Sequence, residues 1–90
     1  MNFFKVLPDF SKIMQKMTKS EIVVLIHLSL IMDYNNSILW DRALQETVSS
    51  VLGIGRHTLQ NNISSLCSKG LLRRDGFQIF VNSDYMKKGR

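Results

Sequence analysis

Apolar side chains recur at helical spacing in four segments of the chain: residues 10–17, 19–32, 42–52 and 56–69. In the first segment they fall at i, i+3, i+4 and i+7, on one helical face: Phe10, Ile13, Met14 and Met17. The second segment is apolar nearly all round, which is typical of a helix buried at the centre of a domain. The third is amphipathic, and the residues predicted to face inward are Leu44, Val48, Val51 and Leu52.

Capping and helix-breaking residues mark the ends of these segments. N-cap residues are expected before three of the helices: Asp9, Thr18 and Asp41. Thr18 and Glu21 have the spacing of a capping box. The Gly53–Gly55 stretch, "GIG", breaks the chain between the third and fourth helices, and Gly70 is a C-terminal stop for the fourth.

Strand signals lie before and after the helical part. The cluster "DYNNS" predicts a turn at residues 33–37, and "SILW" predicts a short strand at 37–40. Two apolar runs flank Asp75-Gly76, which predicts a tight hairpin within residues 71–81. The predicted fold class is mainly α (α+β). The order of elements is that of a winged helix-turn-helix with a C-terminal β-hairpin wing, in one domain over residues 1–90.

The fourth helix has an apolar side and a nearly uncharged polar side. Leu59, Ile63 and Leu66 share the side expected in the core, with Ile54 added from the preceding turn. The opposite side offers groups suited to a DNA major groove, because Arg pairs with guanine and Asn or Gln pairs with adenine. The residues predicted to contact bases are Arg56, His57, Gln60 and Asn61. Thr58 and Ser64 are predicted to lie near phosphates, which the first-turn amides of the helix can also bind.

Positive charge is concentrated in the second half of the chain. The net charge is +5; residues 1–45 hold five basic and four acidic side chains, and residues 46–90 hold seven and three. A basic half favours a polyanionic partner, although solubility alone is an alternative explanation. Arg73 and Arg74 are predicted to hold the wing on the DNA backbone. The remaining cations predicted to add non-specific attraction are Lys69, Lys87, Lys88 and Arg90.

Two stretches resemble known DNA-binding families. "LGIGRHTLQNNISSLCSKGLLRR" is similar to winged-helix domains of MarR-like regulators. "LCSKGLLRRDGFQIFVNSDYMKKG" resembles RepL-type plasmid replication initiators, and the resemblance as a whole covers roughly residues 18–90. The best-matching positions are Leu66, Lys69, Gly70, Leu71, Gly76, Val81, Asn82 and Gly89. Ser83 stands where that family has Pro, and Phe80 where Tyr is common. The resemblance implies origin binding in plasmid replication, with a MarR-like transcriptional regulator as the alternative.

The sequence offers no pattern for catalysis or for a cofactor. It has no Ser-His-Asp arrangement, phosphate-binding loop or metal-ligand spacing, so neither an enzyme nor a cofactor is expected. The single cysteine, Cys67, is predicted to be a small hydrophobe at the core edge. His27 is predicted to pack in the core, and Trp40 to pack either in the core or against the wing. One cysteine fits a reducing setting, and we expect a cytoplasmic, DNA-associated protein.

The apolar N-terminal segment, residues 1–17, leaves two alternatives open. Its side chains either complete the core or form a homodimer contact: Phe3, Phe4, Phe10, Ile13, Met14 and Met17. Dimerisation is favoured here because many helix-turn-helix proteins bind paired half-sites of double-stranded DNA. Two other functions compete with DNA binding: a winged-helix protein-interaction module and a membrane-surface protein. No membrane span is predicted, because the apolar run at 22–32 is too short.

Overall fold

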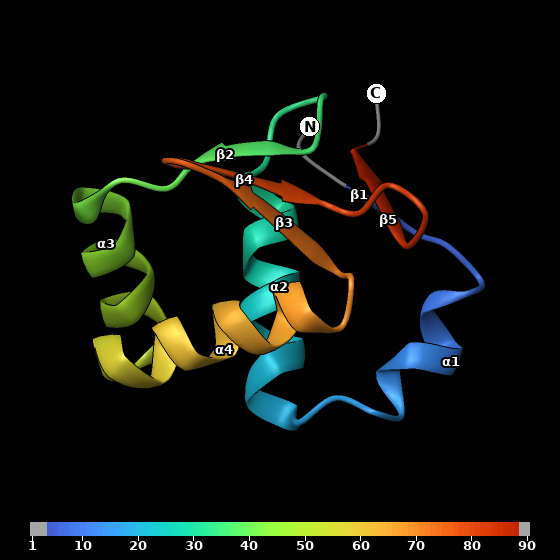
Figure 1. The fold of residues 1–90 in the computed structure, drawn as a ribbon, viewed down its shortest axis with the longest axis horizontal. Helices are drawn as coiled ribbons and strands as arrows, with labels where there is room; N and C mark the ends of the chain where they lie inside the picture. The colour runs from blue at the N-terminus through green and yellow to red at the C-terminus, as the bar shows by residue number, and fades with distance from the viewer. Residues whose placement is uncertain (1–3, 89–90) are drawn as a thin grey trace.

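A computed structural model describes residues 4–88 of the chain. These residues form a small α+β domain of four helices and two small antiparallel sheets. In chain order the elements are β1 (Phe4–Val6), α1 (Phe10–Met14), α2 (Lys19–Ile31), β2 (Ser37–Leu39), α3 (Arg42–Leu52), α4 (Arg56–Ser68), β3 (Leu72–Asp75), β4 (Gln78–Val81) and β5 (Met86–Lys88). Helices α2, α3 and α4 lie on one side of the β2–β4–β3 sheet, and α1 lies apart from them at the other end (Figure 1).

Local capping signals set the starts of α2 and α3. The capping box is confirmed: the Thr18 hydroxyl accepts from the Glu21 amide at 3.1 Å, and the Glu21 carboxylate accepts from the Thr18 amide at 2.9 Å. Asp41 caps α3 by accepting from the Leu44 amide at 2.8 Å. Asp9 occupies the N-cap position of α1, but its side chain makes no capping hydrogen bond. Helix α1 is correspondingly short and ends at Met14.

The prediction that α2 is buried on all sides is wrong. One side of this helix is buried, at Glu21, Val24, Leu25, Leu28 and Ser29. The opposite side leaves large aliphatic side chains 39–44% exposed: Val23, Ile26, Leu30 and Ile31. His27 lies on that side and is half-buried, so the expectation of a core histidine is only partly met. On α3, Val48 is buried as predicted, whereas Val51, which was predicted to face inward, is 63% exposed.

The three-stranded sheet has the order β2–β4–β3, with all pairs antiparallel. The turn of its β3–β4 hairpin lies one residue later than the predicted Asp75-Gly76. Asp75 pairs with Gln78 as the last residue of β3, so the two-residue loop is Gly76-Phe77. Gly76 has φ 61° and Phe77 has a negative φ, the pattern of a type II′ turn with Gly at its first central position. The predicted turn before β2 is confirmed, with Asn36 left-handed at φ 58°.

A second sheet joins the two ends of the described chain. Strand β1 pairs with β5, with Lys5 opposite Lys87, and Figure 1 shows the two strands side by side. The buried amide of Asn36 connects this sheet to the rest of the domain. Its nitrogen donates to the carbonyls of Val81 (3.1 Å) and Met86 (2.6 Å), and its oxygen accepts from the Lys88 amide (3.2 Å). The segment that the sequence treats as a basic tail is therefore a paired strand.

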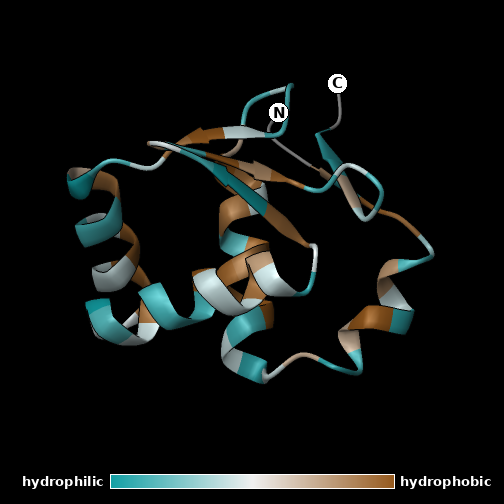
Figure 2. Cartoon of the chain, in the orientation of Figure 1, coloured by the Kyte–Doolittle hydropathy of each residue, from teal (hydrophilic) through white to brown (hydrophobic). Residues whose placement is uncertain are grey.

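The core lies between the helices and the larger sheet. Trp40 is 1% exposed, as predicted, and packs in a cluster to which α2, α4 and the sheet all contribute. Figure 2 shows hydrophobic residues on α2 and on β4, and hydrophilic ones along much of α3 and α4. Of the N-terminal apolar residues, Phe10 is buried, and Phe4, Ile13 and Met17 pack against the core. These four side chains therefore complete the core, which was one of the two alternatives for this segment. Met14 is exposed, and Phe3 lies outside the described residues.

Candidate nucleic-acid interface

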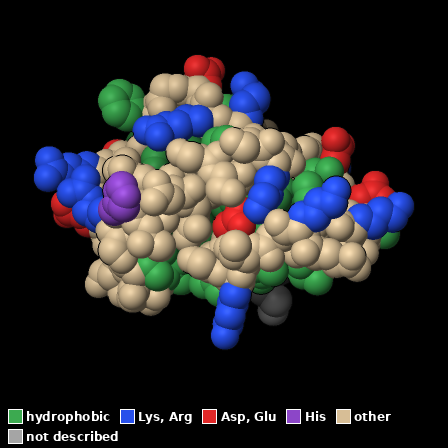
Figure 3. Space-filling model, turned by 60° about the horizontal axis from the view of Figure 1, so that its bottom comes forward, with side chains coloured by type: hydrophobic (Ala, Val, Ile, Leu, Met, Phe, Trp, Pro, Cys, Tyr) green, Lys and Arg blue, Asp and Glu red, His purple; other side chains and the backbone are tan. Residues whose placement is uncertain are grey.

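Helix α4 is attached to the core along one side and exposed along the other. Leu59, Ile63 and Leu66 are buried, as predicted. The six residues predicted to face DNA from this helix are all exposed: Arg56, His57, Thr58, Gln60, Asn61 and Ser64. Turning the lower side of Figure 1 forward shows a broad uncharged surface, with Lys and Arg side chains standing apart from one another around it (Figure 3). The face thus offers hydrogen-bonding groups with little charge of its own.

The turn before α4 is fixed by hydrogen bonds to α3. Gly53 ends α3 in the left-handed conformation, with φ 67°. The Ile54 amide donates to the Ser49 carbonyl at 3.1 Å, and the Ser49 hydroxyl donates to the Ile54 carbonyl. Gly55, the N-cap of α4, supplies no side-chain acceptor to the first helical turn. The first-turn amides therefore have no side-chain acceptor at the cap, and such amides favour an anion.

A buried polar network that the sequence interpretation missed holds α4 against α2. The carboxylate of Glu21, 2% exposed, accepts from the Ser65 hydroxyl at 2.7 Å and from the Lys69 ammonium at 2.8 Å. One turn earlier, the side-chain amide of Asn62 donates to the Ser20 hydroxyl at 2.6 Å. The signal was present in the sequence, because residues 62, 65 and 69 lie at i, i+3 and i+7 along one helical stripe.

The network keeps Glu21 ionised. Burial alone would raise the pKa of this carboxyl, but hydrogen bonds from Lys69, from Thr18 and from Ser65 outweigh burial and lower it from 4.5 to about 2. Lys69, predicted to attract DNA, therefore has its charge matched by Glu21, and only 27% of its side chain is exposed. The structure places Lys69 as a link between two helices rather than as a free surface cation.

The two arginines of the predicted wing point to opposite faces of the sheet. Arg74 is the cross-strand partner of buried Ile79, so its side chain leaves the sheet on the α4 side. Burial raises the pKa of the nearby Cys67 thiol, and the positive charge of Arg74 offsets part of that rise. Arg73 is the partner of Phe80 and lies on the outer face, over the Phe80 ring. Arg74 thus shares a surface with α4, and Arg73 does not.

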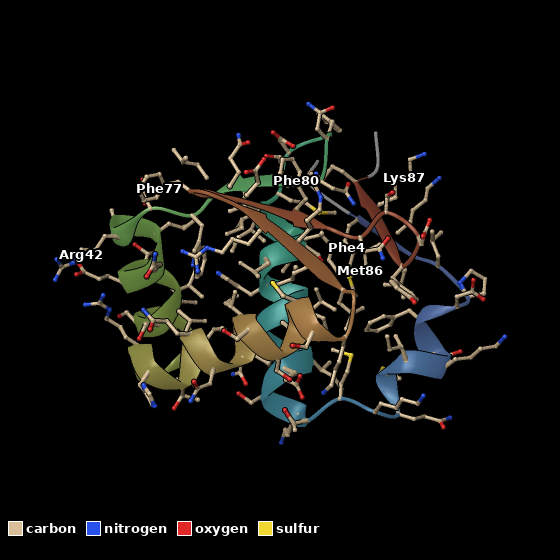
Figure 4. All side chains as sticks on the ribbon, in the orientation of Figure 1. Phe4, Arg42, Phe77, Phe80, Met86 and Lys87 are labelled. Carbon is tan, nitrogen blue, oxygen red and sulfur yellow. The ribbon has the colours of Figure 1, made fainter. Side chains whose placement is uncertain are left out.

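Of the remaining predicted cations, the two that the structure describes, Lys87 and Lys88, also lie away from α4 (Figure 4). Lys87 and Lys88 belong to β5; Lys87 is exposed, whereas the Lys88 ammonium donates to the Leu30 carbonyl at 3.2 Å. Arg90 is outside the described residues. The structure brings together seven of the predicted site residues, those of α4 with Arg74, and separates Lys69, Arg73, Lys87 and Lys88 from them.

Residues 4–88 contain no cluster of His, Cys, Asp or Glu that could hold a metal ion. In the same part of the chain, none of the helices combines the length and the apolar character needed to cross a membrane. Cys67 is half-buried and packs against the core, as predicted. Comparison of the chain with protein-family models, curated proteins and solved structures finds no match.

Proposed function

We propose that this protein is a winged helix-turn-helix that binds double-stranded DNA through α4. The observation that supports this most is the division of α4 into a side fixed to α2 and a side of exposed hydrogen-bonding groups. Arg56, His57, Gln60 and Asn61 contact base edges in the major groove, and Thr58 and Ser64 lie near phosphates. The succession of α2, β2, α3, α4 and the β3–β4 hairpin supports the winged-helix assignment.

The proposed biological role follows from resemblance alone. The likeness of the segment from Leu66 onward to RepL-type initiators points to origin binding in replication of a plasmid or other mobile element. Regulation of transcription by a MarR-like protein is the alternative within the DNA-binding role. In either case the protein acts by binding, in the cytoplasm, and without catalysis of its own. Pairing of two copies through residues 1–17 stays a prediction, for which Met14 is the exposed apolar side chain on α1.

A protein-interaction module without DNA binding is the second candidate function. It is favoured by the uncovered aliphatic side of α2, at Val23, Ile26, Leu30 and Ile31. Exposed apolar patches of this kind are common at contacts between proteins. Absence of any binding to mixed-sequence duplex at low salt would favour this candidate over DNA binding.

Substitution of two α4 residues tests the DNA-binding proposal. Arg56→Ala and Asn61→Ala should each weaken binding to a preferred duplex, selected from a random pool, by about 1–3 kcal/mol. Both should also relax sequence preference, because each removes a bidentate base contact. Affinities for the preferred and a scrambled duplex, measured by fluorescence anisotropy at one salt concentration, give both quantities.

Arg42→Ala is the matched control for charge. Arg42 is an exposed arginine at the far end of α3, paired with Glu46 at 3.4 Å, and Figure 4 shows it at the edge of the domain. It should leave the ratio between the two duplexes unchanged. Equal losses in Arg42→Ala, Arg56→Ala and Asn61→Ala would show that α4 does not contact bases.

A further inference from the structure

The outer face of the larger sheet holds a groove that the proposed α4 contact does not use. Its volume is about 620 Å³, within the range of about 300–1,000 Å³ of ligand sites. The floor is formed by β3 and β4, and the walls by the turn before β2 and by Asn82, Ser83 and Lys87. Phe80 on β4 and Lys87 on β5 lie on the upper side of the view in Figure 4, whereas α4 lies on the lower side.

The groove is positively charged. Two of its lining residues, Arg73 and Lys87, are exposed cations, and none of the lining residues is an Asp or a Glu. The nearest acidic residue in the turn, Asp33, is outside the lining, and its carboxylate accepts from the amides of Asn35 and Ser37 at 2.9 Å. A second groove, beside α1, is less suited to an anion, since it includes Asp9 and the already paired Lys69.

Aromatic and cationic groups are stacked in the groove. The Arg73 guanidinium lies 4.4 Å from the centre of the Phe80 ring, at cross-strand partner positions that hold both side chains on the outer face. Tyr34 contributes a second ring to the lining. Unpaired bases stack on aromatic rings and on guanidinium groups, and phosphates pair with nearby cations.

We propose that this groove binds a short single-stranded segment of nucleic acid. A base stacks on the Arg73–Phe80 pair, and the adjacent phosphate is bound by Lys87, with Ser83 and Asn35 at the walls as hydrogen-bonding groups. A single strand suits the groove better than a duplex, because bases within a duplex are already stacked on each other and cannot reach Phe80. Positive charge combined with stacking surfaces is the usual basis of such binding.

The proposed groove and α4 belong to different surfaces. Phe80 and Arg73 alternate along their strands with Ile79 and Leu72, which are buried on the core side where α4 packs. A duplex seated on the exposed side of α4 would therefore not cover the groove. Single-strand binding in the groove is therefore independent of duplex binding on α4.

Binding of a labelled, mixed-sequence single strand of about ten nucleotides, followed by fluorescence anisotropy at about 0.1 M salt, tests the proposal. Arg73→Ala, Lys87→Ala and Phe80→Leu should each weaken binding by about fivefold or more. Phe80→Leu keeps every charge and removes only the ring. Arg42→Ala and Lys16→Ala, at exposed cations outside the groove, are the matched controls and should change the affinity by less than about twofold. Thermal unfolding of each variant confirms that the fold is retained.

The proposal would be overturned if the unaltered protein did not bind the single strand, or if the groove and control variants lost affinity equally. It would also be overturned if Arg56→Ala and Asn61→Ala lost as much single-strand affinity as the groove variants. Competition by inorganic phosphate and by a mononucleotide shows whether the groove binds the base as well as the phosphate. Inorganic phosphate that displaces the strand as well as a mononucleotide does would identify a simple anion site instead. Duplex of the same length is measured in parallel. If the proposed function is wrong, the duplex binding that depends on Arg56 and Asn61 is absent and single-strand binding is still seen. If the groove proposal is wrong, the single-strand binding that depends on Arg73 is absent and duplex binding is still seen.

Discussion

At the scale of single residues, Glu21 stands out because its charged side chain is buried. A buried carboxylate is strongly destabilising unless it is paired and its lone pairs are satisfied. Here both oxygens accept hydrogen bonds, from Lys69, Ser65 and the Thr18 amide. The same carboxylate thus completes the cap of α2 and attaches α4 to it. Its charge therefore adds a polar link between two helices that also share the apolar core.

Acidification should therefore destabilise the protein through Glu21. Because the pKa is lowered on folding, from 4.5 to about 2, the stabilisation is complete above pH 4.5 and is lost as the pH falls toward 2. The loss should be on the order of 3 kcal/mol in the free energy of unfolding. Urea unfolding at a series of pH values measures it. Glu21→Gln should be less stable at neutral pH and should show a weaker pH dependence over this interval.

Glu46→Gln is the control for this prediction. Glu46 forms an exposed i,i+4 pair with Arg42 on α3, and exposed pairs of this kind contribute little. Its variant should retain the pH dependence of the unaltered protein. Parallel pH curves for Glu21→Gln and the unaltered protein would show that the buried carboxylate is not the titrating group.

At the scale of elements, the sequence predicts well whatever is encoded over a few neighbouring residues. The capping box, the Asp41 cap, the left-handed turn before β2 and the hairpin all have local chemical causes. The sequence does not show which distant segments meet, even where one of the partners, such as the polar stripe at residues 62, 65 and 69, can be seen in it. The pairing of β1 with β5 joins strands about 80 residues apart along the chain, and Glu21 meets Lys69 across 48 residues. The exposed side of α2 was missed because an all-apolar helix does not show which side faces the core.

The α3–α4 turn gives a test at this scale, because its two glycines differ in conformation. Gly53 is left-handed at φ 67°, whereas Gly55 is extended at φ −68° and ψ 154°, and neither has an atom near the position of an added Cβ. Gly53→Ala should destabilise the domain by about 1 kcal/mol, because left-handed alanine costs about 1–2 kcal/mol and reduced freedom of the unfolded chain offsets part of it. Urea unfolding at neutral pH measures the change.

Gly55→Ala serves as the paired control. Its backbone angles suit alanine, so the entropic gain is available, while the loss of glycine at an N-cap costs a similar amount. The net change should lie within about 0.5 kcal/mol of zero. Equal effects of the two substitutions would mean that the left-handed conformation of Gly53 does not govern the stability of the turn.

At the scale of the whole molecule, positive charge is distributed over several surfaces. Arg74 lies on the α4 side of the sheet, Arg73 and Lys87 lie in the outer groove, and the partly buried Lys69 is paired with Glu21. A count of basic residues in the second half of the chain therefore overstates the charge available to a duplex on α4. Sequence alone could not reveal this, because alternation along β3 and a contact with α2 decide where each cation lies.

The salt dependence of duplex binding separates these cations. Each phosphate contact contributes about −0.9 to the slope of log K against log salt concentration. Arg74→Ala should reduce the magnitude of that slope by about 0.9, since Arg74 shares a surface with α4. The double variant Glu21→Gln/Lys69→Met removes one charge of each sign and should leave the slope unchanged, because the Lys69 ammonium is already bound by the carboxylate at 2.8 Å. Arg42→Ala, outside the interface, should also leave it unchanged. A slope reduced by the double variant as much as by Arg74→Ala would place Lys69 at a phosphate, and would mean that DNA binding draws this side chain away from Glu21.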